Sequence, residues 1–146
     1  MEIKKLETKD LPDFRNLLEI FKDVFDNDCE IPDDNYLNKL LSNKYFLVFV
    51  VKKNGEVIGG LTIYILHQYY NSKPLAYIYD VGIAKNFQGQ GIGKKLIFEV
   101  CEFCKQNGIE SAFVQAEDDD EAAINFYNQT NINNQIRAIH FNYLFE

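Results

Sequence analysis

The segment that decides the fold is the glycine-rich run Gln88-Gly89-Gln90-Gly91-Ile92-Gly93. A strand-like pattern over residues 75–83 precedes it, and apolar residues at helical spacing follow it from Ile92 to Cys104. A loop that opens a helix presents several free backbone N–H groups and the positive end of the helix dipole at one place. The run therefore indicates a cradle for phosphate groups. The alternative is an ordinary turn between a strand and a helix.

Two common nucleotide-binding motifs are excluded by the same residues. The run lacks the Gly-Lys-Ser/Thr ending of a Walker loop. It also lacks a third glycine at the place that a dinucleotide-binding fingerprint requires, and it follows a long β-hairpin pattern. The loop is thus expected to bind phosphate groups in another way.

Hydrophobic periodicity on either side of the loop predicts one continuous series of elements, without repeats or linkers. The expected strands are residues 2–6, 45–51, 57–66, 75–83, 109–116 and 136–145; the expected helices follow Asp10 as an N-cap, occupy residues 33–42, run from Ile92 to a closing Gly108, and occupy residues 122–129. Asn54-Gly55 is a type I′ turn signal and predicts a hairpin. The strand at 109–116 completes a β–α–β crossover with parallel strands. We expect an α/β fold, a mixed central sheet flanked by helices, as a single domain over residues 1–146.

The composition limits the class of partner. The chain has 146 residues, of which 47% are apolar and 25% charged, an ordinary globular balance. Its formal net charge of −7 repels nucleic acid and anionic membrane surfaces and attracts cations. No run approaches the roughly 20 apolar residues of a membrane span, and the N-terminus does not resemble a signal peptide. We expect a cytoplasmic protein with a cationic partner, and neither nucleic acid nor membrane as a partner.

The three cysteines, Cys29, Cys101 and Cys104, do not have the spacing of a disulfide framework. Cys101 and Cys104 form a C-x-x-C inside a helical pattern, without a second cysteine pair or a nearby histidine to complete a zinc site. Buried thiols and no metal are therefore expected.

Gln88, Gly91 and Gly93 complete the signature Gln/Arg-x-x-Gly-x-Gly/Ala after a strand, and in this the chain resembles the GNAT N-acetyltransferases. The resemblance implies acetyl-CoA as co-substrate, with the loop amides on the coenzyme A pyrophosphate. It also implies a GNAT fold in which the preceding strand splays from its neighbour and pairs with the pantetheine arm. The implied coenzyme contacts are Val81, Ile83, Gln88, Gly89, Gln90, Gly91, Ile92, Gly93, Lys94 and Asn125.

A second element of the resemblance is Asn125-Phe126-Tyr127, in the expected helix at residues 122–129. In the family, a tyrosine at this place faces the thioester, and a phenol can protonate the departing thiolate. The resemblance thus implies Tyr127 as the general acid. The alternative is a tyrosine that packs its ring on the sheet with its hydroxyl in water.

The resemblance narrows to the aminoglycoside 3-N-acetyltransferases of the gentamicin and fortimicin type. The segments that carry it are Phe25-Asp26, Tyr36-Leu37, Val57-Ile58-Gly59-Gly60-Leu61, Tyr77-Ile78-Tyr79-Asp80, Val114-Gln115-Ala116-Glu117, Asp120-Glu121 and His140-Phe141. It implies acetylation of the 3-amino group of a small polycationic substrate. Where such enzymes usually carry consecutive arginines, this chain has Gln88 and Gly89. Charge for the coenzyme phosphates is then expected from Lys85, Lys94 or Lys95.

Five consecutive acidic residues, Glu117-Asp118-Asp119-Asp120-Glu121, precede the helix with the tyrosine. We expect them, together with Asp80, to hold the ammonium groups of the substrate. The alternative is a helix N-terminus stabilised by acids through an N-cap and the helix dipole. Acetyl transfer needs a neutral amine, so a base must accept a proton, and Glu117 and Asp80 are the candidates. His140 is open between a substrate contact and a core or rim histidine.

The expected mechanism is direct attack of the amine on the thioester, without an acyl-enzyme. A strand amide near Ile83 would help the oxyanion of the tetrahedral intermediate. Two other hypotheses stay open: a GNAT enzyme for a polyamine, an amino acid or a protein amine, and a non-catalytic acyl-CoA sensor. The family often forms homodimers, and the expected strand at residues 136–145 is a candidate edge for one.

Overall fold

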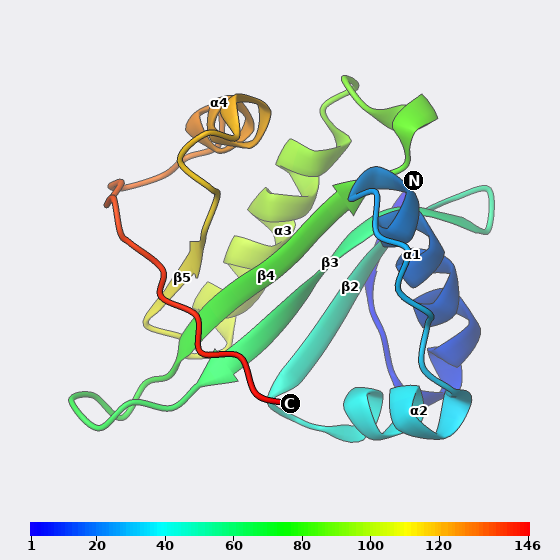
Figure 1. Ribbon diagram of the computed structural model, residues 1–146, viewed down its shortest axis with the longest axis horizontal. Coiled ribbons are helices and arrows are strands. Elements are labelled where there is room, and N and C mark those ends of the chain that lie inside the picture. The colour runs from blue at the N-terminus through cyan, green and yellow to red at the C-terminus, as the bar shows by residue number, and fades with distance from the viewer. The chain divides into compact units, whose positions relative to one another are not determined.

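A computed structural model describes all residues, 1–146, and contains one five-stranded sheet in the order β1-β2-β3-β4-β5 (Figure 1). The strands are β1 (Glu2–Lys5), β2 (Phe46–Lys53), β3 (Glu56–Leu66), β4 (Leu75–Ile83) and β5 (Ser111–Val114); the α-helices are α1 (Leu11–Val24), α2 (Asp34–Ser42), α3 (Ile92–Gln106) and α4 (Glu121–Asn128), with short 3₁₀ turns at Thr8–Asp10 and Lys85–Phe87. The first four strands are antiparallel, and β4 and β5 are parallel. The prediction of a mixed sheet is confirmed.

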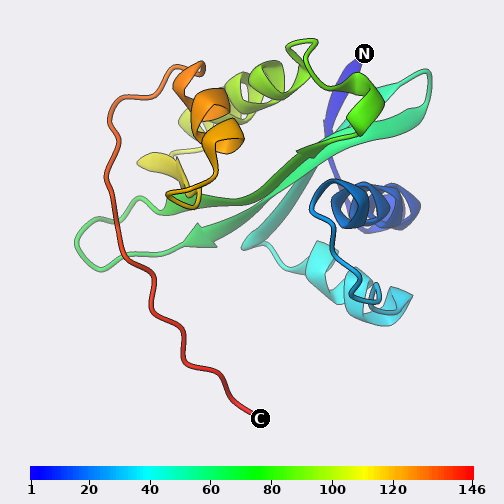
Figure 2. The ribbon, with the colours of Figure 1, turned by 45° about the horizontal axis from the view of Figure 1, so that its top comes forward.

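The chain divides into two compact units, residues 1–115 and 116–146. The first unit contains the whole sheet with α1, α2 and α3. In it, α1 and α2 lie on one face of the sheet and α3 on the other (Figure 2). The second unit contains α4 and the C-terminal residues. The expected single domain over residues 1–146 stays a prediction.

The hairpin of β2 and β3 forms where the sequence predicts it. Asn54 and Gly55 both have positive φ angles, 51° and 81°, as a type I′ turn requires. Lys53 and Glu56 are the first register partners beyond the turn. The two turn residues determine the pairing next to the turn, and a register shift between Val51 and Lys52 changes the pairing further along the strands.

Close packing of α1 on the sheet depends on small residues in β3 and β4. Phe14, Leu17 and Phe21 form the buried face of α1. A Cβ at Gly60 would lie 2.9 Å from a Leu17 methyl carbon, and one at Gly82 would lie 2.9 Å from the Phe21 ring. Larger side chains at these glycines would push α1 away from the sheet.

Helix α3 begins and ends at glycines in the left-handed region. Gly91 is its N-cap residue with φ 79°, and Gly108 follows its C-cap with φ 72°. The N–H of Ile109 donates to the carbonyl of Cys104 at 3.1 Å, which is the bond of a Schellman ending. The chain then enters β5, so the predicted β–α–β crossover is confirmed, with a shorter final strand than residues 109–116.

The strand expected at residues 136–145 is wrong. The structure has no helix or strand after Asn128, and residues 133–146 are exposed and make no backbone hydrogen bonds with one another or with other residues. Alternating apolar residues predict a strand only if a neighbouring strand takes up their N–H and C=O groups. The periodicity of this segment does not by itself supply such a neighbour.

Two smaller expectations need correction. Cys29 and Cys101 are exposed, and only Cys104 is buried, where burial raises the pKa of its thiol to about 11. Cys101 faces outward because helical periodicity puts it off the buried stripe that Val100 and Cys104 share. Asp10 occupies the N-cap position of α1, but its carboxylate accepts from the Glu7 N–H at 2.8 Å instead of from a helix amide.

None of the helices is both long enough and apolar enough to cross a membrane.

Candidate functional site

The glycine loop and the start of α3 form an open set of backbone donors. Gly89 and Gly91 have φ angles of 74° and 79°, and a Cβ at either would meet no atom within 4 Å. The first backbone bond of the helix runs from Lys95 N to Gly91 O at 3.1 Å. The amides of residues 91–94 therefore lie ahead of the hydrogen-bond ladder, at the positive end of the α3 dipole. This arrangement fits a phosphate cradle, and the cradle stays a prediction.

The side chain of Gln88 holds this loop to the end of β4. Its amide nitrogen donates to the Ile83 carbonyl at 2.8 Å. Gln88, which the resemblance implies as a coenzyme contact, therefore also has a structural role, because it holds the loop next to the end of β4.

Positive charge near the cradle comes from exposed lysines. The Lys85 ammonium lies 3.3 Å from an Asp23 carboxylate oxygen, so Lys85 already forms an ion pair with an acidic residue of α1. Lys94 and Lys95, in the first turn of α3, are exposed and have no ion-pair partner. These two residues fit the phosphate groups better than Lys85.

Strand β4 is paired on both sides only over its first half. Its parallel pairing with β5 ends at Ile78 and Val114, and Figure 1 shows β4 continuing beyond β5. Residues 79–83 of β4 have a neighbour on one side only, where Val81 pairs with Leu61 of β3. Val81 and Ile83 thus lie on a stretch with one free edge, as the implied pairing with a pantetheine arm requires.

A β-bulge lies within the same stretch. Register partners Leu61–Val81 and Ile63–Ile78 leave only Thr62 on β3 opposite both Tyr79 and Asp80 on β4. The Asp80 N–H donates to the Thr62 hydroxyl at 3.3 Å. Adjacent strand residues normally face opposite sides of a sheet, but a bulge turns two of them to the same side. Tyr79 and Asp80 therefore both face α1 and α2.

Asp80 is half-buried and chemically unsatisfied. Its carboxylate makes no hydrogen bond or ion pair with the protein, and burial raises its pKa above the ordinary value. Such a group binds a cation or accepts a proton more readily than an exposed aspartate does.

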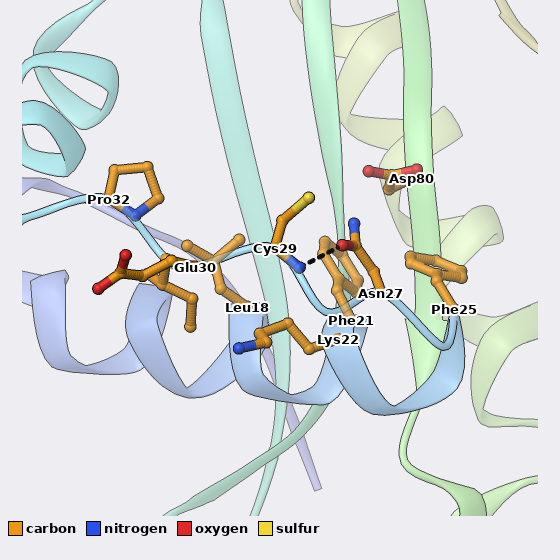
Figure 3. Close-up of a pocket in the computed structure, with 10 residues that line it drawn as sticks. Leu18, Phe21, Lys22, Phe25, Asn27, Cys29, Glu30, Pro32 and Asp80 are labelled. Carbon is orange, nitrogen blue, oxygen red and sulfur yellow. Dashed lines mark hydrogen bonds between the residues drawn. The ribbon is translucent and has the colours of Figure 1, made fainter.

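Two hollows meet at Asp80. One, of about 180 Å³, lies between β4 and the segment from the end of α1 to Pro32; Figure 3 shows Asp80 across from Asn27 and Cys29. The other, of about 230 Å³, lies between the sheet and α2. Its polar lining consists of Tyr36, Thr62, Tyr64, Tyr79 and Asp80.

The second unit contains the five consecutive acids, all exposed. Asp120 caps α4, accepting the Ala123 N–H at 3.1 Å, so the N-cap alternative is confirmed for this residue. Asp118 pairs with Arg137 at 2.7 Å. The Glu117, Asp119 and Glu121 side chains have no partner in the protein and remain available to a cationic ligand.

The remaining predicted residues also lie in this unit. Asn125 is exposed, and Tyr127 is partly buried with its ring 5.0 Å from that of Phe126. His140 is exposed, so the interpretation as a core histidine is wrong. A substrate contact by His140 stays a prediction.

The structure thus brings together, within residues 1–115, the phosphate loop, the free edge of β4 and Asp80. Sequence reasoning missed the aromatic residues beside Asp80, namely Tyr36, Tyr64 and Tyr79. The alternation of Tyr77-Ile78-Tyr79 puts two tyrosines on one face of a strand, and this is a local signal for the position of Tyr79. Tyr36 comes from α2, and no pattern in the sequence places it next to β4.

With this geometry established, comparison with known proteins identifies the family. The sequence pattern of the acetyltransferase (GNAT) family matches residues 11–131. The chain belongs to the GNAT acetyltransferases. Members of this family use acetyl-CoA, and the loop amides and the free β4 edge fit its pyrophosphate and pantetheine groups. The chain is therefore an acetyltransferase with the GNAT fold.

Solved structures of similar proteins agree with this assignment. An aminoglycoside acetyltransferase, meta-AAC0020, from an uncultured soil metagenomic sample was solved with trehalose; it is 43% identical, with a TM-score of 0.97, over 99% of this chain and 96% of that one. Its sisomicin complex gives 42% identity, the same TM-score and the same coverage. A second aminoglycoside acetyltransferase from such a sample, HMB0005, is 26% identical over 99% of this chain and 98% of that one, with a TM-score of 0.91.

Substitution of Gly91 by alanine tests the cradle. Gly91→Ala places a Cβ on a left-handed residue, at a cost of about 1–2 kcal/mol, and tilts the amides at the start of α3. We expect coenzyme A to bind at least fivefold more weakly, as measured by isothermal titration calorimetry. Gly108→Ala is the matched control, because Gly108 has a similar φ angle at the other end of the helix. Equal losses of affinity in both variants would contradict the cradle.

The charge on Asp80 should cost stability at neutral pH. Because burial raises the pKa of Asp80, its charged form is disfavoured in the folded state. Asp80→Asn should therefore have a higher Tm than the wild type at pH 7. The gain should shrink as the pH falls, and it should vanish below about pH 4, where the carboxyl is protonated in both states.

Thermal unfolding at several pH values measures this difference. Asp28→Asn is the control, because Asp28 is exposed and without a partner in the loop after α1. A lower Tm for Asp80→Asn at pH 7 would show that the protein stabilises this carboxylate after all.

Proposed function

We propose that this chain transfers the acetyl group of acetyl-CoA to an amine of an aminoglycoside, and specifically to the 3-amino group. The observation that carries the substrate class is the 43% identity to an aminoglycoside acetyltransferase over 99% of the chain. The half-buried carboxylate of Asp80, which has no partner in the protein, supports a cationic acceptor independently.

Acetyl-CoA supplies a thioester whose carbonyl carbon the acceptor amine attacks. The proposed task of residues 91–94 and Lys94 is to hold the coenzyme phosphates. The free edge at Val81 and Ile83 would align the pantetheine arm by backbone hydrogen bonds, and an amide near Ile83 would stabilise the oxyanion. These contacts would orient the thioester for attack by the amine.

Proton transfer is assigned in the proposal to Asp80 or Glu117 and to Tyr127. In the proposal, the amine nitrogen forms the new N–C bond as Asp80 or Glu117 accepts its proton, directly or through water. The C–S bond breaks, and the Tyr127 phenol donates its proton to the departing thiolate. Glu117, Asp119 and Glu121 would attract the other ammonium groups of the acceptor.

A thiol-release assay tests the substrate class. Purified protein and acetyl-CoA are mixed in turn with sisomicin, gentamicin, spermidine, amino acids and short peptides, and free coenzyme A is followed with time. We expect release with the aminoglycosides, and acetylation at the 3-amino group by NMR of the product. Release of coenzyme A only with spermidine, amino acids or peptides would contradict an aminoglycoside substrate. Binding of acetyl-CoA without release with any amine would indicate a non-catalytic sensor.

The role of Tyr127 is tested by removal of its hydroxyl. Tyr127→Phe should lower kcat by about 10²-fold, because the thiolate then leaves without a proton donor. The KM for acetyl-CoA should stay within twofold of the wild type. Tyr143→Phe is the control, since Tyr143 is an exposed tyrosine of the same unit. An unchanged kcat in Tyr127→Phe would remove the general-acid assignment.

A further inference from the structure

An aromatic row crosses the sheet on the face of α1 and α2. Its members are cross-strand register partners on neighbouring strands: Phe46, Tyr64, Tyr77 and Phe113. Ring centroids are 5.2 Å apart for Phe46 and Tyr64, and 4.7 Å apart for Tyr77 and Phe113, which stack nearly in parallel at 7°. Register thus aligns side chains from four strands into one surface.

Tyr79 of β4 belongs to the same surface, two residues after Tyr77, and the bulge turns Asp80 to this side next to it. Its ring lies 5.4 Å from Tyr64 and 5.6 Å from Tyr77. Both contacts are edge-to-face, which holds the ring in one orientation relative to the row.

The row is buried at Phe46 and open at Tyr64 and Tyr79, next to it. Phe46 is 6% exposed and packs against Phe14 of α1, with ring centroids 6.1 Å apart. Tyr64 is 39% exposed and Tyr79 is 53% exposed. Adjacent aromatic rings left open on a sheet face form an apolar patch of the kind that marks ligand-binding grooves.

The exposed part of the row, Tyr64 and Tyr79, forms a wall of the larger hollow at Asp80. Tyr36 of α2 lines the same hollow, as do Tyr64 and Tyr79. Its volume of about 230 Å³ is below the roughly 300–1,000 Å³ of pockets that enclose a whole drug-sized ligand. The hollow therefore suits a single ring of a larger molecule.

An amine-bearing sugar or cyclitol ring matches these groups. Its C–H faces can pack on aromatic rings, and its ammonium group is attracted by both aromatic faces and a carboxylate. We propose that Tyr36, Tyr64 and Tyr79 form an aromatic subsite that takes one amine-bearing ring of the acceptor and directs its ammonium group to Asp80. This proposal rests on the proposed function and deepens it. It favours a ring-bearing acceptor over a linear polyamine.

Removal of the Tyr79 ring is the direct test. Tyr79→Leu should raise the KM for sisomicin about tenfold, because a ring contact and a cation–π contact are lost together. The KM for acetyl-CoA should not change. Tyr79→Phe should keep the KM for sisomicin within about twofold, since the ring itself makes the contact. Tyr69→Leu is the control, as Tyr69 is 89% exposed in the loop between β3 and β4.

Thermal unfolding of each variant separates a binding effect from a folding defect. If Tyr79→Leu is too unstable to assay, Tyr36→Leu on α2 tests the opposite wall of the hollow. Equal KM values for sisomicin in the wild type and in a folded Tyr79→Leu or Tyr36→Leu would overturn the subsite and leave the proposed function standing. A wild-type protein that neither binds nor acetylates sisomicin or gentamicin would overturn both.

A second test compares the binding of spermidine and of sisomicin to the same variants, measured by calorimetry. Loss of the ring contact should weaken sisomicin binding several-fold more than spermidine binding. An equal loss of affinity for both compounds would show that the tyrosines recognise charge alone. That result would contradict the proposal that they pack against a ring of the acceptor.

Discussion

Between Ile78 and Val81, strand β4 contains one more residue than β3 opposite it, and the arrangement of the proposed acceptor site depends on that bulge. Without it, Tyr79 and Asp80 would face opposite sides of the sheet. With it, an aromatic ring and a carboxylate stand next to each other on the face of α1 and α2. The Asp80 N–H donates to the Thr62 hydroxyl. This bond satisfies a backbone donor that has no ladder partner at the bulge.

The same strand also provides the edge to which the proposal assigns coenzyme A. Because parallel pairing with β5 stops at Ile78, the second half of β4 keeps one edge free while β3 holds the other. The Gln88 side chain then ties the glycine loop to the Ile83 carbonyl, so that the start of α3 is fixed near the end of the free edge. One strand therefore places the proposed phosphate cradle, an unpaired backbone edge and an acidic group within a few residues of each other.

Several groups of this region are poorly satisfied within the protein. The Asp80 carboxylate has no partner, the amides of residues 91–94 precede the helical ladder, and Tyr64 and Tyr79 expose their rings. Each is a group to which we assign a part of a ligand: an ammonium, a phosphate or a ring. By contrast, Asp120 and Asp118 in the second unit are already engaged by α4 and Arg137.

The sequence by itself determined the elements whose rules act over a few residues. The hairpin at Asn54-Gly55, the bounds of β4 and the glycines at both ends of α3 follow from turn chemistry, alternation and capping, all of them local. Tertiary structure alone decided the bulge, the approach of Tyr36 to Asp80 and the exposure of Cys29 and Cys101. It also left residues 136–145 without the strand that their alternation predicts. The reason is physical: register and pairing depend on which distant segments meet, and one extra residue in β4 changes the face of every side chain that follows without changing the local pattern.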